Sequence, residues 1–250
     1  MVSKTERFIR VAFIVAVAAI QGAIIWGCIT KNSDAANWII AGANVAMAVA
    51  AYAAYRSAKR YLTEFFAKEG YTLAINMVNN NLIELNVDNK LLTTCSTLVT
   101  HYKNNDQKPY RDVDVNLLKS SLNLLQSVYR DNDNWKKNIA RLEKQMLSYG
   151  ITASPHKASY LTEMVLSLDK CLINVYPVML HLFDEIKRCE KRQQSGSNLS
   201  ERFVTTNESD LDGYLADLSL NWNKMTACYK SFFEGDRHIK SLFSVRMREN

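Results

Sequence analysis

Two uncharged apolar segments stand back to back near the start of the chain, and they most constrain how it can fold. Residues 11–30 form a run of 20 and residues 35–55 a run of 21, and neither contains Asp, Glu, Lys or Arg. A helix rises about 1.5 Å per residue, so either run can cross a hydrocarbon core roughly 30 Å thick. Only residues 31–34 separate them. The sequence therefore predicts a tight transmembrane hairpin, with spans at about 9–30 and 36–55.

Charge predicts the orientation of this hairpin. Six basic residues flank the two runs and one lies in the turn between them. The side richer in Lys and Arg stays in the cytoplasm, so both termini are expected there. A cleaved signal peptide is the alternative, but the apolar core of a signal spans about 7–15 residues and is not followed by a second span. The flanking cations are Lys4, Arg7, Arg10, Arg56, Lys59 and Arg60.

The rest of the chain, residues 61–250, is predicted to form one cytosolic helical domain with its own core. The whole chain has only three prolines and eight glycines, and apolar residues recur at spacings of three and four, which is typical of helices. We expect an all-α protein whose domain is an antiparallel bundle or elongated coiled coil, with a polar linker at about 193–208. The expected core or interface residues are Leu118, Leu122, Trp135, Ile139, Leu215, Trp222 and Tyr229.

Turn signals predict where these helices begin and end. A helix over residues 61–102 is weakened by the run Asn79-Asn80-Asn81, because asparagine has low helix propensity. Gly150 is expected to cap a later helix, and Pro155 to begin its successor. No alternation of apolar and polar residues typical of strands is present. The sequence therefore predicts no β-structure.

Recognisable catalytic and ligand-binding motifs are missing from the sequence. The four histidines show no H-x-x-x-H pair, and the five scattered cysteines no C-x-x-C pair. There is no glycine-rich phosphate loop and no nucleophile elbow. The net charge of +6 arises largely from the cations that flank the hairpin, so it does not indicate nucleic acid. We expect a protein that is not an enzyme, with no cofactor, metal or small-molecule substrate.

The apolar runs themselves carry small residues and two amides. Small residues at helical spacing let helices approach closely in lipid. Gln21 and Asn44 lie within roughly one helical turn of the same depth, and an amide in hydrocarbon needs a partner. That partner is either the other amide of the same hairpin or a neighbouring copy, and both alternatives stay open. The small residues are Ala19, Ala23 and Gly27 in the first run and Gly42, Ala46 and Ala50 in the second.

In its layout, a two-span hairpin followed by a helical domain, the chain resembles the two-transmembrane bacterial effectors of antiphage and abortive-infection systems, such as retron-associated effectors. The resemblance concerns layout and transfers no site residues. It implies a toxin of the bacterial inner membrane whose helical domain is held by a cytosolic protein or ribonucleoprotein. Release would let hairpins oligomerise in the lipid bilayer and perturb it. The alternative is a membrane-anchored coiled-coil scaffold that recruits a cytosolic partner.

Overall fold

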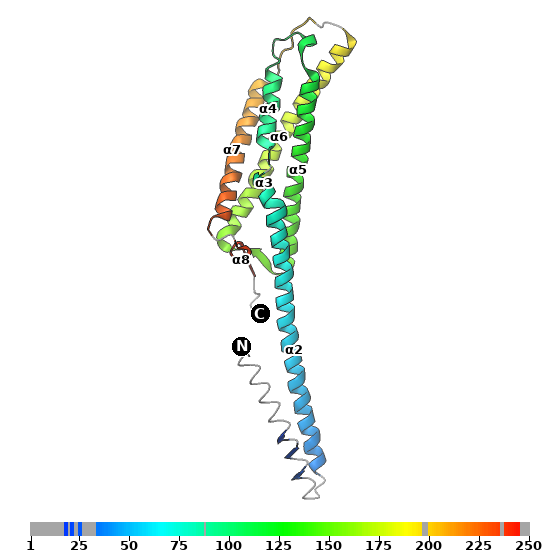
Figure 1. Ribbon diagram of the computed structural model, residues 1–250, viewed down its shortest axis with the longest axis vertical. Coiled ribbons are helices and arrows are strands. Elements are labelled where there is room, and N and C mark those ends of the chain that lie inside the picture. Colours follow the sequence, from blue (N-terminus) through cyan, green and yellow to red (C-terminus); the bar gives the residue numbers. More distant parts are fainter. Residues whose placement is uncertain are drawn as a thin grey trace. The chain divides into compact units, whose positions relative to one another are not determined.

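The computed structural model describes residues 18–19, 21–22, 25–26, 34–87, 89–196, 200–235 and 238–245. The described chain is mostly helical, and its helices pack as a bundle (Figure 1). It divides into two compact units, residues 1–66 and 67–250. Most of the first predicted span, with Ala23 and Gly27, lies outside the described residues. The transmembrane hairpin therefore stays a prediction.

Helix α2 (Asp34–Met77) is uninterrupted, and the boundary between the two units falls within it. It contains no proline, so every turn can keep its backbone hydrogen bonds. A short π-helix, η1 (Val78–Leu82), and helix α3 (Ile83–Val87) follow it. The chain thus stays helical through its asparagine run, and the expected helix over 61–102 is instead broken at Asn89 and Lys90, just before Leu91 begins the next helix. The wider π turn coincides with burial of Val78, Asn81 and Leu82.

Four helices of the second unit run side by side (Figure 1). Lys119 pairs with Glu190, and Lys136 with Asp169 at 2.7 Å, so α5 and α6 are antiparallel. Gly150 follows the end of α5 with a φ of 75°, a left-handed conformation that glycine adopts without strain, as expected of a helix cap. The helices are α4 (Leu91–Lys103), α5 (Val115–Ser148), α6 (Pro155–Ser195) and α7 (Glu208–Phe233).

A small antiparallel sheet was not expected from the sequence. Strand β1 (Ile151–Ala153) pairs with β2 (Phe243–Val245), which follows the short helix α8 (Ile239–Leu242). Each strand has three residues, too few for a visible alternation, and they pair across some ninety positions of chain. Gly70 of α2 lies against β1, since a Cβ there would come within 2.4 Å of the Ile151 side chain. This close approach explains the glycine.

The polar segment predicted as a linker is partly packed against the bundle. Helix α6 continues to Ser195, and Phe203 is only 1 % exposed. The Phe203 ring meets Tyr102 and Tyr110 edge-on, with centroids 5.6 and 5.7 Å away. Its backbone N–H donates to the carbonyl of Lys108 at 2.7 Å. Tyr110 begins the short 3-10 helix η2 (Tyr110–Asp112), so this helix packs against Phe203.

Candidate functional site

The apolar part of α2 is the first candidate surface. None of the described side chains between residues 39 and 66 is buried. Ile40, Val45 and Met47 are each about 60 % exposed. Exposure of so many large apolar side chains on consecutive turns is unusual for a surface in contact with water alone. By length and composition this helix could cross a membrane.

One face of this segment is less exposed than the others. Gly42 and Ala46, both predicted as packing residues, are half-buried, whereas the predicted Ala50 is exposed. The half-buried residues recur at spacings of three and four, which places them on one side of the helix. They are Ile39, Gly42, Ala46, Val49 and Ala53, and we refer to them as the packed stripe.

Asn44 lies on the side of α2 opposite the packed stripe, because a helix has about 3.6 residues per turn. Its side chain is exposed, as is that of Asn37 two turns earlier. Gln21 and Ala19 of the first run are exposed as well. In the described part of the chain, no side-chain hydrogen bond joins Gln21 to Asn44. Whether each amide pairs within the hairpin or with a neighbouring copy therefore stays open.

Aromatic and basic side chains crowd the end of the apolar segment, where the basic residues were predicted as flanking cations and the tyrosines were not predicted. Tyr52 and Tyr55 are more than 60 % exposed, and Arg56, Lys59 and Arg60 follow, also exposed. The aromatic signal was visible in the sequence, since tyrosine next to Lys and Arg commonly marks a membrane–water interface. The other predicted flanking cations, Lys4, Arg7 and Arg10, lie outside the described residues.

Helix α6 is the second described helix that is long and apolar enough to cross a membrane, but 44 % of its apolar window is buried within the protein. Leu168, Leu172 and Leu182 are at most 2 % exposed, as in the core of a helical bundle. Its outer side remains apolar, with Ile173 61 % and Leu180 52 % exposed. We refer to this outer side as the α6 outer face, which is formed by Leu166, Ile173, Tyr176 and Leu180.

The seven residues predicted for the bundle core divide into two groups. Leu118, Leu122 and Ile139 are fully buried. The other four are half-buried and pack against the core from its edges. Trp222 contacts both of the hydrophobic clusters into which the core divides. The half-buried members are Trp135, Leu215, Trp222 and Tyr229.

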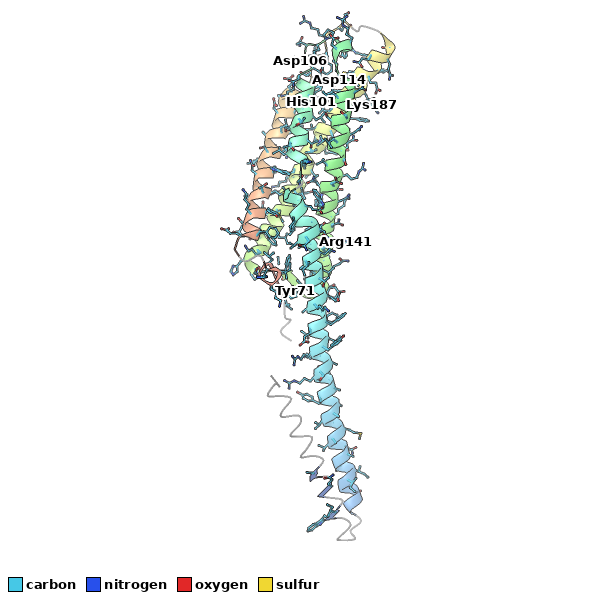
Figure 2. All side chains as sticks on the ribbon, viewed as in Figure 1. Tyr71, His101, Asp106, Asp114, Arg141 and Lys187 are labelled. Carbon is cyan, nitrogen blue, oxygen red and sulfur yellow. The ribbon has the colours of Figure 1, made fainter. Side chains whose placement is uncertain are left out.

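The polar side chains at one end of the bundle have structural partners. Figure 2 places His101, Asp106, Asp114 and Lys187 at this end, with Tyr71 and Arg141 towards the other. Asp114 caps α5 by accepting a hydrogen bond from the backbone N–H of Leu117. Asp106 accepts from the backbone N–H of Thr205, which lowers the pKa of its carboxyl. Lys187 lies over the ring of Phe183, 4.1 Å from its centroid.

Three thiols of the bundle are buried and unreactive. Burial raises the pKa of Cys95 and Cys171 to about 12 and that of Cys189 to about 11. They therefore stay protonated at neutral pH, and a thiol is a poor nucleophile and metal ligand. Among the residues described, no group of three or more His, Cys, Asp or Glu could hold a metal ion.

Comparison of the chain with known protein families, characterised proteins and solved structures found no match.

Proposed function

We propose that this chain is an effector of the bacterial inner membrane, whose hairpin, residues 1–60, oligomerises in the bilayer. The helical domain, residues 61–250, is held by a cytosolic partner until a trigger releases it. The observation that carries the proposal is the apolar segment of α2, which is unburied throughout and carries Asn44 on its exposed side.

A bilayer is the cover that suits the apolar segment best. The exposed side chains include Ile40, Val45 and Met47, and burying each such side chain gains about 1.5–3 kcal/mol. A lipid environment also demands that every backbone group be satisfied within the helix. Helix α2 meets this demand because it is continuous and has no proline.

The two sides of α2 favour an oligomer over a plain anchor. Gly42 and Ala46 of the packed stripe allow close contact with another helix, and the first span is the nearest helix in the chain that can pack there. Asn44 on the opposite side would then meet lipid, where an unpartnered amide is costly. A second copy can supply the missing hydrogen bond, worth on the order of 1 kcal/mol in membranes. A simple anchor would gain nothing from this asparagine.

The α6 outer face supports a protein partner for the helical domain. Ile173 and Leu180 are apolar, lie on the same side of the helix and are more than half exposed. Such patches on soluble domains commonly mark interaction sites. The same face also favours the alternative function, a membrane-anchored scaffold that recruits a cytosolic protein. The two functions differ in whether the hairpin acts on the membrane.

The test is the membrane potential of cells that express the protein, read with a voltage-sensitive dye. One variant combines Gly42→Leu with Ala46→Leu, and a second combines Gln21→Leu with Asn44→Leu. Both should still reach the membrane, since the changes raise hydrophobicity, yet both should lose depolarisation. The matched control, Ala43→Leu with Ala54→Leu, alters exposed positions that lie neither on the packed stripe nor on the side of Asn44. This control should still depolarise the membrane. Wild-type protein that never depolarises cells, even when triggered, would leave the scaffold as the better function.

A further inference from the structure

We propose that the end of the apolar segment of α2 binds the headgroups of anionic phospholipids. The site consists of Tyr52, Tyr55, Arg56, Lys59 and Arg60, which we call the lipid collar. The proposal rests on the membrane location given above and adds the lipid class to it. Depth, shared helix face and charge each point to this ligand.

The collar lies at the depth where headgroups begin. Residues 35–55 span about 31 Å as a helix, which matches a hydrocarbon core of roughly 30 Å. Tyr52 and Tyr55 therefore fall at the edge of the core, and Arg56 to Arg60 extend about 7 Å beyond it. The headgroup layer on one side of a bilayer is about 5–7 Å thick. The three cations thus occupy the layer that contains lipid phosphates.

The five side chains share one side of the helix. Their spacings of three, four and one residues repeat over two turns, so they form a continuous strip. Tyr52 is 61 % and Tyr55 63 % exposed, which leaves their rings free to lie among acyl chains with the hydroxyls directed to water. Arg56, Lys59 and Arg60 are exposed beside them. Long basic side chains of this kind extend their charge to the interface while their stems stay apolar.

The charge of the collar is only partly neutralised by the protein. Arg60 pairs with Glu64 at 2.9 Å, but both side chains are largely exposed, so the pair is weak. Within the described chain, Arg56 and Lys59 have no ion-pair partner. The two positive charges of Arg56 and Lys59 are therefore available to phosphate oxygens, and arginine can bind such oxygens through two parallel hydrogen bonds. A zwitterionic headgroup would not match this net charge.

The experiment uses the full-length protein reconstituted into nanodiscs with equal amounts of phosphatidylglycerol and phosphatidylcholine. Lipids that stay bound after gentle release into detergent are counted by native mass spectrometry. One cation near an anionic surface contributes roughly a fivefold preference. We expect phosphatidylglycerol to be enriched at least about fivefold on the wild-type protein. The variant Arg56→Gln, Lys59→Gln, Arg60→Gln should lose most of this enrichment, since only Lys4, Arg7 and Arg10 remain as cations that flank the hairpin.

The matched control removes two arginines and one lysine from exposed positions of α5, as Arg130→Gln, Arg141→Gln, Lys144→Gln. It should keep the full enrichment. Equal binding of both lipids by the wild type, or unchanged enrichment in the collar variant, would overturn the lipid collar while leaving the membrane location intact. A wild-type protein that is washed from the bilayer at alkaline pH would overturn the proposed function and the collar together.

Discussion

Helices α2 and α6 are equally able to cross a membrane by length and hydropathy, yet they differ in how much of their apolar surface is buried within the protein. The apolar window of α2 has no buried residue, and that of α6 is 44 % buried. In α6 the apolar side chains Leu168, Leu172 and Leu182 fill the bundle core. In α2 the apolar side chains point outwards around most of the helix. The comparison teaches that hydropathy identifies a candidate span, whereas burial decides whether protein or lipid covers it.

Truncating one apolar side chain in each helix should show the largest difference between α2 and α6. Leu182 of α6 is fully buried, so Leu182→Ala should lower the free energy of unfolding by about 2–5 kcal/mol. Ile40 of α2 is 58 % exposed, and Ile40→Ala should change it by less than about 0.5 kcal/mol. Urea unfolding of the full chain in detergent, followed by circular dichroism, measures both. Equal losses would mean that α2 also packs into a protein core.

A second truncation concerns the link between the two halves of the bundle core. Trp222 of α7 is half-buried and touches both hydrophobic clusters, so its ring links the two halves of the core. Trp222→Ala should cost about 2 kcal/mol, less than a fully buried tryptophan would. Trp222→Phe keeps most of the contact and should recover the larger part. A variant that unfolds at the wild-type urea concentration would place Trp222 outside the core.

The sequence was sufficient for the helices and for part of the core. Leu118, Leu122 and Ile139 were found by their heptad spacing, because a helix repeats its buried face regularly. Phe203 was missed because most of the residues around it in the sequence are polar, and because the rings that it packs against, Tyr102 and Tyr110, lie about one hundred residues away. The strands were missed because their pairing is equally distant in the chain. Local periodicity carries no information about such long-range contacts.

In the candidate site, too, local spacing predicted some features and could not predict those that depend on distant parts of the chain. Spacing identified Gly42 and Ala46 as packing residues of the apolar segment, and both fall on its packed stripe. The sequence left open whether Asn44 meets Gln21 or another copy, because a pattern along one helix does not reveal what covers its other side. The exposure of the α6 outer face was not predicted, because Ile173 and Leu180 belong to an apolar helix whose other apolar residues are mostly in the core.

A smaller effect is expected from a polar group at the edge of the bundle. Burial raises the pKa of Glu143 on α5 above its ordinary value of 4.5. The folded state therefore holds this proton more tightly than the unfolded state, and stability falls as pH rises from 4.5 through the raised pKa. Glu143→Gln should stabilise the bundle at pH 7 and have little effect at pH 4. Urea midpoints at the two pH values measure this, and an equal gain at both would contradict it.

If lipid covers the apolar segment of α2 and protein covers that of α6, only α2 is accessible from the acyl chains of a bilayer. A lipid-soluble photoactivatable carbene reagent measures this access on the full-length protein in bilayers, with labelled peptides located by mass spectrometry. We expect label on residues 35–55 of α2 and none on residues 155–195 of α6. The soluble glutathione adduct of the same reagent serves as the control for labelling from water. Label on α6, or an α2 segment left unlabelled, would contradict the account.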